Sequence, residues 1–288
     1  MSLQVVSHYR ILKKLGAGGM GDIYLAQDLR LNRYAAVKFL SPHFASDPQR
    51  LLRFKQEAQL AAAINHPNVL TIYDLDEDEG VNFIVTEFVD GKTLRHAMNE
   101  RRLSLQQAVN VGIAIASALG AAHDYWVVHR DIKPENVMVR DDGVVKVLDF
   151  GLAKVTQGTL FTDISAARVQ TLPGVVPGTL QYVAPELLRG EAADPRSDLW
   201  SLGAVMYEML AGRAAFSGKA LLDTMHEILQ SEPRAIGEDV PSALRSVQQK
   251  LLKKEPQERY QTSRELLVDL YEVRDALRAS EGSISSVS

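Results

Sequence analysis

A short segment in the middle of the chain carries several groups that could do chemistry together. Residues 127–139 read VVHRDIKPENVMV, so five ionisable residues fall within seven positions between valines and a methionine. Asp131 could accept a proton, Lys133 could stabilise a negative charge, and Asn136 offers a neutral oxygen to a metal ion. A polar loop between two short strands would explain the solubility of this segment but not its composition. The spacing therefore indicates a base, a cation and a metal ligand in one loop.

A further carboxylate that could share this site is Asp149. It follows VVKVL, which reads as a strand, and it opens the tripeptide DFG. An isolated Asp-x-Gly is usually only a turn. Together with Asn136, however, Asp149 makes an all-oxygen pair. Such a pair suits Mg²⁺, because this ion takes few protein ligands and several phosphate oxygens.

A glycine-rich segment near the N-terminus could bind phosphate. Residues 16–21 read GAGGMG, which fits G-x-G-x-x-G. Glycine lets backbone N–H groups approach phosphate oxygens without a Cβ in the way. A dinucleotide-binding turn would be followed by a helix, yet the next residues, DIYLAQD, read as a strand. The context therefore favours a hairpin that covers phosphates, and a plain glycine-rich hairpin is the alternative.

Lys38 and Glu57 could complete a phosphate site. Lys38 ends the apolar run AAVK, where a lysine can also reach solvent along its own stem. Glu57 falls in a helical pattern and could equally lie on a solvated face. A phosphate site becomes the better interpretation when the two residues are considered together, because a carboxylate beside a strand lysine would fix its ammonium group near the phosphates.

The elements that must position these residues change in character along the chain. From Tyr9 to Val89 short β-branched and aromatic runs predict strands, interrupted by one helix that begins at Asp47-Pro48 and stops before HPN at 66–68. From Leu103 onward the pattern is helical. We therefore expect an α+β protein with a small sheet-rich lobe, a larger helical lobe and a ligand cleft between them.

Composition limits the class of protein. The 288 residues carry a net charge of −4 with a pI near 6.0, which argues against a surface for nucleic acid or anionic lipid. Cysteine is absent, which fits a reducing compartment. The most apolar stretches, 111–122 and 200–210, are shorter than the roughly 20 residues of a spanning helix. We expect buried helices, no membrane segment within this chain and a cytoplasmic location, either alone or as the cytoplasmic domain of a larger membrane protein.

With these motifs in place, the chain resembles the protein kinase family, and most closely the bacterial (Hanks-type) serine/threonine kinases. GAGGMGDI, AAVK, HRDIKPEN, DFG and APE at 184–186 occur in the family's order, from about Tyr9 to about Leu277. The resemblance implies a bilobal fold, with an antiparallel-sheet N-lobe that has one main helix and a mostly helical C-lobe. The implied divisions are an N-terminal extension at 1–8, a kinase domain at 9–278 and a Ser-rich tail or linker at 279–288. Within the domain, the N-lobe covers about 9–86, the hinge about 87–91 and the C-lobe about 92–278.

The resemblance also implies cofactors and residue roles. ATP would be used with Mg²⁺, or with Mn²⁺ in its place. Lys38 would contact the α and β phosphates and pair with Glu57, and Asp131 would accept the proton of the substrate hydroxyl. The catalytic set is Asp131, Lys38, Lys133 and Glu57, and the metal ligands are Asn136 and Asp149. The nucleotide-binding set is Leu15, Gly16, Ala17, Gly18, Gly19, Met20, Gly21, Asp22, Ile23, Ala36, Lys38, Glu87, Val89 and Met138.

Further family features have matches in this chain. Lys133 and Gly178-Thr179 fit the serine/threonine branch. Glu186 and Arg259 are expected to form a buried ion pair, and Asp198 is expected to brace the catalytic loop.

The resemblance also predicts partners and a modification. Protein substrates and ATP are the expected partners, a homodimer for trans-autophosphorylation is left open, and nucleic acid is not expected. We expect autophosphorylation within residues 156–179, at Thr171, because Arg130 beside Asp131 would need a fixed anion.

Two alternatives to a protein kinase remain. A pseudokinase that acts as a scaffold usually lacks the lysine, a catalytic aspartate or a metal ligand, and this chain retains all of them. An enzyme of the same fold that phosphorylates a small molecule is disfavoured by the full activation segment and APE, which build a peptide-docking surface.

Overall fold

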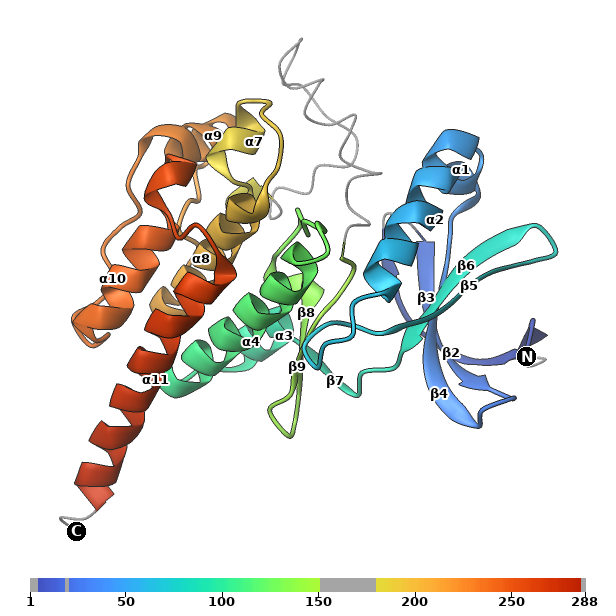
Figure 1. Ribbon diagram of the computed structural model, residues 1–288, viewed down its shortest axis with the longest axis horizontal. Helices are drawn as coiled ribbons and strands as arrows, with labels where there is room; N and C mark the ends of the chain where they lie inside the picture. The colour runs from blue at the N-terminus through green and yellow to red at the C-terminus, as the bar shows by residue number, and fades with distance from the viewer. Residues whose placement is uncertain (1–4, 19–20, 151–179, 286–288) are drawn as a thin grey trace.

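The fold has two lobes. It is known from a computed structural model that describes residues 5–18, 21–150 and 180–285. In Figure 1 the large sheet lies with α1 and α2 in one lobe, and most other helices form a larger lobe beside it. This arrangement confirms the bilobal α+β fold.

The N-lobe is built on a six-stranded antiparallel sheet. Its order is β1-β2-β3-β4-β6-β5. One cluster of buried side chains includes Ala26, Val37 and Phe83, and a second, with Ile84, includes residues of the helix that packs on the sheet. The strands are β1 (Val5–Val6), β2 (Tyr9–Gly18), β3 (Gly21–Asp28), β4 (Arg33–Phe39), β5 (Ile72–Asp78) and β6 (Val81–Glu87).

The main N-lobe helix begins where the sequence predicts. α2 (Pro48–Ala62) follows the short α1 (Pro42–Ala45), and the side chain of Asp47 accepts hydrogen bonds from the N–H groups of Gln49 and Arg50. This cap satisfies donors that the first helical turn leaves free, and proline fits the first turn because it has no N–H to lose. Phe54 and Ala58 bury one face of α2 against the sheet, which places Glu57 of the same helix in the N-lobe.

The C-lobe is assembled around a helix that is buried on nearly every side. α8 packs against α4, α10 and η2, and its Trp200, Leu202 and Tyr207 are almost fully buried. The helices are α3 (Leu94–Glu100), α4 (Leu105–His123), α7 (Pro185–Leu188), α8 (Pro195–Ala211), α9 (Leu221–Gln230), α10 (Ser242–Leu251), α11 (Ser263–Ser285), and the 3-10 turns η1 (Pro134–Asn136), η2 (Leu180–Tyr182) and η3 (Pro256–Glu258). A small sheet of β7 (Gly91–Thr93), β8 (Val137–Arg140) and β9 (Val145–Val147) lies at its edge.

α4 is the one helix of the described residues that is long and apolar enough to cross a membrane by length and composition. Half of its apolar window is buried in the C-lobe, where α8 and α11 pack against it. A helix in the core of a globular protein can have the same length and apolar composition.

α11 extends into the residues predicted to form a Ser-rich tail or linker. The helix continues to Ser285, so residues 279–285 are helical, and the division of the chain at 279 stays a prediction. Ala276, Leu277, Arg278 and Ala279 are strong helix formers, and they carry the helix past the last buried positions.

The two lobes meet where β9 runs beside the segment 68–70. The N–H of Val147 donates to the carbonyl oxygen of Asn68 at 2.8 Å, and the N–H of Leu70 donates to that of Val147 at 2.9 Å. Lys146 donates to the Glu87 carboxylate at the end of β6 at 2.7 Å. These bonds fix the end of β9, and therefore the position of Asp149, relative to the N-lobe.

Candidate active site

One buried carboxylate fixes the position of the loop that carries Asp131. Asp198 of α8 is fully buried and accepts hydrogen bonds of 2.8 Å from the backbone N–H groups of His129 and Arg130. His123 contacts the same carboxylate at 2.8 Å through Nε2. A buried charge is tolerated when hydrogen bonds satisfy it. The predicted brace at Asp198 is confirmed.

This brace supports an uncommon backbone conformation. Arg130 has φ of 68°, in the left-handed region that a residue with a side chain adopts rarely. His129 is buried next to it, with Nε2 lying 2.7 Å from the carbonyl oxygen of Leu148 and its ring 4.7 Å from that of Phe150. The loop is thereby tied to the strand end that carries Asp149.

The side chain of Asp131 is surrounded by the other polar groups of its loop. One carboxylate oxygen, Oδ2, lies 2.7 Å from the Lys133 ammonium and accepts a hydrogen bond of 2.8 Å from the Asn136 amide. The same amide nitrogen donates to the Asp131 backbone carbonyl at 2.8 Å. The structure thus brings together the three residues that the sequence singled out, and Asp131 remains 20% exposed at its side chain.

Asn136 and Asp149 are brought to one place by the pairing of β8 with β9. The N–H of Leu148 donates to the backbone carbonyl of Asn136 at 2.9 Å, which sets Asp149 beside the end of η1. Asp149 has φ of 56°, also left-handed. An amide oxygen and a carboxylate form a donor set that fits Mg²⁺, which binds few protein oxygens. The described ranges contain no cluster of three or more His, Cys, Asp or Glu residues that could form a richer metal site.

The partner of Lys38 differs from the expectation. Lys38 is buried, and its ammonium lies 2.9 Å from Asp149 Oδ2. Among the described residues, no salt bridge joins Lys38 to Glu57. The left-handed backbone of Asp149 presents its carboxylate to the N-lobe strand, and this carboxylate takes the place expected of Glu57. Burial raises the pKa of Asp149, but the charge and hydrogen bond of Lys38 outweigh burial and lower it.

The glycine-rich segment forms a hairpin, as the sequence predicts. β2 pairs with β3 from Tyr9 opposite Asp28 to Gly18 opposite Gly21, and Gly19 and Met20 lie outside the described residues. Gly21 has φ of 148°, and a Cβ on it would lie 1.7 Å from the carbonyl oxygen of Phe39. No other residue type fits there without movement of the chain. Nearby, Asp22 pairs with Lys14 at 2.7 Å.

The remaining nucleotide-binding candidates lie on neighbouring strands and at the start of the C-lobe. Ala36 on β4 is opposite Thr86 on β6, and Ile23 on β3 is opposite Lys38. Glu87 ends β6, Val89 follows it, and Met138 lies on β8. Leu15, Gly16 and Ala17 lie on β2 before the turn of the hairpin. The candidates are therefore distributed over both lobes.

Sequence reasoning missed a network around Arg95 of α3. Its guanidinium lies 2.8 Å from Glu135 of η1 and 2.6 Å from Glu208 of α8, and it also hydrogen-bonds to Tyr182 of η2. Tyr182 donates to Glu208 at 2.5 Å. Burial lowers the pKa of Arg95, but the two carboxylates outweigh burial and raise it. Glu135, which lies within HRDIKPEN, was the one member of this network that a sequence motif contained. Nothing in the sequence indicates that Arg95 is its partner.

The ion pair expected between Glu186 and Arg259 is confirmed. Both side chains are buried, and Arg259 donates to the two carboxylate oxygens at 2.9 and 2.7 Å. Burial raises the pKa of Glu186, but the bonds from Arg259 outweigh burial and lower it. This bidentate pair anchors α7, which follows η2 and lies close in sequence to the residues 151–179 outside the described part of the chain.

Comparison with known proteins agrees with this geometry. The family model of the protein kinase domain matches residues 9–271. The chain is 39% identical to the serine/threonine-protein kinase PknB of Mycolicibacterium smegmatis, over 93% of this chain and 43% of that protein. It is 36% identical to the serine/threonine-protein kinase PrkC of Bacillus subtilis, over 96% of this chain and 42% of that protein.

A solved structure is also similar. The crystal structure of the Mycobacterium tuberculosis PknI kinase domain superposes with a TM-score of 0.72 at 26% identity, covering 95% of this chain and 98% of that one. The chain spans about two fifths of the length of the two curated relatives. By motif order, fold and similarity, the chain belongs to the protein kinase family and falls among its bacterial serine/threonine members.

Proposed function

We propose that this chain is an ATP-dependent protein kinase domain that transfers the γ-phosphoryl group to serine and threonine hydroxyls of proteins. The observation that carries the proposal is the arrangement of Asp131, Lys133 and Asn136, whose polar groups meet within 2.8 Å on a loop that buried Asp198 braces. Family membership supports the assignment.

In the proposed reaction, Asp131 orients the substrate hydroxyl and accepts its proton. The hydroxyl oxygen forms a bond to the γ-phosphorus, and the bond between that phosphorus and the β–γ bridging oxygen of ATP breaks to release ADP. Lys133, 2.7 Å from Asp131, stabilises the negative charge at this place. Asn136 and Asp149 would hold Mg²⁺ or Mn²⁺, which neutralises phosphate charge when bound.

The nucleotide is assigned to the cleft between the lobes. The β2–β3 hairpin would cover the phosphates, Lys38 would contact the α and β phosphates, and Ala36 and Met138 would line the adenine. The hinge backbone at Glu87 and Val89 would bind its polar edge. Supporting this, Lys38 is paired with Asp149, a carboxylate of the proposed metal site, so phosphate and metal binding would be neighbours.

We further propose that Glu57 becomes the partner of Lys38 during turnover. Lys38 and Asp149 each have a proposed partner in the nucleotide complex, the phosphates and the metal ion respectively, and we propose that the pair opens as these contacts form. Glu57 lies on α2 of the same lobe as Lys38 and is the carboxylate proposed to replace Asp149.

We propose autophosphorylation of Thr171, which lies outside the described residues. The support is Arg130, which directly precedes Asp131 and makes no ion pair with any described residue. A phosphothreonine carries about −1.5 to −2 charges and would supply the missing anion. Transfer between two copies of the chain would require a transient homodimer.

The wider organisation is proposed from the same evidence. A kinase domain at 9–278 contains the family match, with protein substrates as partners and a cytoplasmic location. The chain covers about two fifths of its relatives, so the activity and partners of the whole protein are part of this proposal.

The direct test is transfer of label from [γ-³²P]ATP to a generic protein substrate, followed by phosphoamino-acid analysis. We expect phosphoserine and phosphothreonine, dependence on Mg²⁺ or Mn²⁺, and phosphate on Thr171 by mass spectrometry. Nucleotide binding without any transfer would indicate a scaffold. Label found only in small molecules of a metabolite extract would indicate a small-molecule phosphotransferase.

A further inference from the structure

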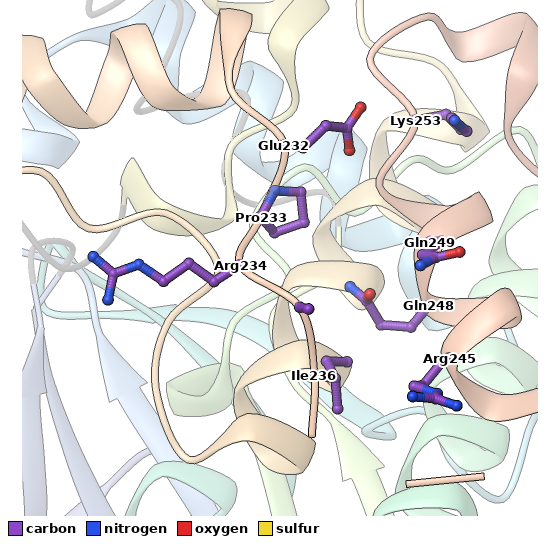
Figure 2. Close-up of a pocket in the computed structure, with 9 residues that line it drawn as sticks. Glu232, Pro233, Arg234, Ile236, Arg245, Gln248, Gln249 and Lys253 are labelled. Carbon is purple, nitrogen blue, oxygen red and sulfur yellow. The ribbon is translucent and has the colours of Figure 1, made fainter. Parts of the chain in front are cut away.

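A hollow in the C-lobe shares no residue with the active site. It has a volume of about 470 Å³ and lies between the segment 232–236 on one side and α10, with Lys253 just after this helix, on the other (Figure 2). In Figure 1, α10 is on the side of the C-lobe remote from the N-lobe. The volume falls within the range of small-molecule sites, roughly 300–1,000 Å³.

The wall of this hollow contains a buried hydrogen-bond donor for which the described residues provide no acceptor. α10 places Arg245, Gln248 and Gln249 on one face at i, i+3 and i+4. Gln248 is only 2% exposed, and its Nε2 has no hydrogen-bond partner within the described part of the chain. Figure 2 shows its amide directed across the hollow toward Pro233. A buried amide that lacks a partner is costly, so an acceptor supplied by a ligand would be favourable at this position.

The charges around the hollow define which acceptor fits. Arg245 and Lys253 line it, and neither forms a salt bridge with a described residue. Glu232 contributes one carboxylate, and the Arg234 side chain points away from α10 (Figure 2). The wall therefore has a net charge of about one positive unit, which matches a monoanion better than a dianion.

The rest of the wall is apolar. Pro233, Ala235 and Ile236 contribute to it, and Ile236 is largely buried. A ligand with a compact apolar body could cover these side chains. Its carboxylate could accept from the planar fork of Arg245, and from Gln248 on the same helix face. We propose that this hollow binds a small apolar monocarboxylate, at a site separate from the nucleotide cleft.

The test uses 1-naphthoate as the probe and the whole chain as the protein. The nucleotide cleft is first saturated with a non-hydrolysable ATP analogue, so that binding there does not contribute. We expect naphthoate to bind one-to-one by calorimetry and to shift the NMR signals of the Gln248 amide and Arg245 Nε. Naphthalene-1-methanol, which lacks the charge, should bind at least about tenfold more weakly, and 1-naphthyl phosphate should bind no more tightly than naphthoate.

Variants localise the site. Arg245→Gln and Gln248→Leu should each weaken naphthoate binding by about tenfold or more. Arg278→Gln, which removes one positive charge from exposed α11, should leave binding unchanged. Arg245→Gln keeps the test valid if Gln248→Leu does not fold. Failure of naphthoate to shift either signal, equal binding of the neutral alcohol, or tighter binding of the phosphate would overturn the proposal.

Discussion

The ammonium of Lys38 and the carboxylate of Asp149 lie 2.9 Å apart, although 111 residues separate them in the chain. The pair joins β4 of the N-lobe to the end of β9 in the C-lobe. Under the proposed function the pair opens when the nucleotide binds, because Lys38 would contact the phosphates and Asp149 would hold the metal ion. The described arrangement is therefore proposed to rearrange before phosphoryl transfer.

Asp149→Asn should lose the dependence of nucleotide affinity on Mg²⁺, because the substitution replaces a carboxylate ligand with an amide. Calorimetric titration of ATP with and without Mg²⁺ measures this. Asp141→Asn, an exposed acid in the β8–β9 turn, should keep the wild-type dependence on Mg²⁺. An unchanged Mg²⁺ effect in Asp149→Asn would remove Asp149 from the metal site.

Gly21→Ala should destabilise the N-lobe and lower the affinity for ATP. Its Cβ would lie 1.7 Å from the carbonyl oxygen of Phe39, so β3 or β4 must move. Gly16→Ala is the matched control for stability, because a Cβ on Gly16 meets nothing within 4 Å. Thermal unfolding of both variants measures the effect on stability, and nucleotide titration of Gly21→Ala against wild type measures the effect on affinity. Equal thermal stability of the two alanine variants would show that the close approach of β3 and β4 does not contribute to stability.

Glu186→Gln should cost about 3–5 kcal/mol of unfolding free energy at pH 7, because Arg259 is left buried without a charged partner. The pKa of Glu186 is lowered in the folded protein, so the stability from this pair is present above about pH 4.5 and is lost as the pH falls through the folded value. The gap between wild type and variant should therefore narrow in acid.

Urea unfolding of Glu186→Gln at pH 7 and near pH 4 measures this gap. Glu258→Gln, at an exposed position, is the control and should match wild type at both values. A gap that stays constant with pH would mean that Glu186 does not act through its charge.

Lys254 should titrate far below the usual pKa of a lysine side chain, 10.5. Burial lowers its pKa to about 8, and its ammonium lies over the rings of Trp200 and Phe216. Because the pKa is lower when folded, the unfolded chain binds more protons between about pH 8 and 10.5, and this residue raises stability as the pH increases through that window. NMR titration of the lysine side chains, assigned with Lys254→Met, should show one midpoint near 8. A midpoint above 10 for Lys254 would contradict this.

Much of the fold followed from local sequence signals. Asp47-Pro48 predicted the start of α2 because the cap and the first-turn proline act within a few residues. The strand after GAGGMG predicted a hairpin and excluded a dinucleotide turn. The continuation of α11 to Ser285 was missed because serine and glycine suggested a linker, whereas the preceding alanine and leucine extended the helix.

The site was less predictable where contacts between distant segments decide it. Asp131, Lys133 and Asn136 are neighbours in sequence, and their contacts follow from one loop. The pairing of Lys38 with Asp149 depends on the left-handed backbone at Asp149. This conformation cannot be predicted from the residue type. The Arg95 network joins α3, η1, η2 and α8, so its pairing exists only after folding.

The central claim is that Asp131 accepts the proton of the substrate hydroxyl, and single-turnover phosphoryl transfer by Asp131→Asn tests it most directly. We expect the rate to fall by about 10²- to 10⁴-fold, the usual contribution of a positioned general base, while ATP affinity stays close to wild type. Asp124→Asn, an exposed acid that precedes the loop, should transfer phosphate at the wild-type rate. Near-normal turnover by Asp131→Asn with its fold and ATP affinity intact would contradict the account.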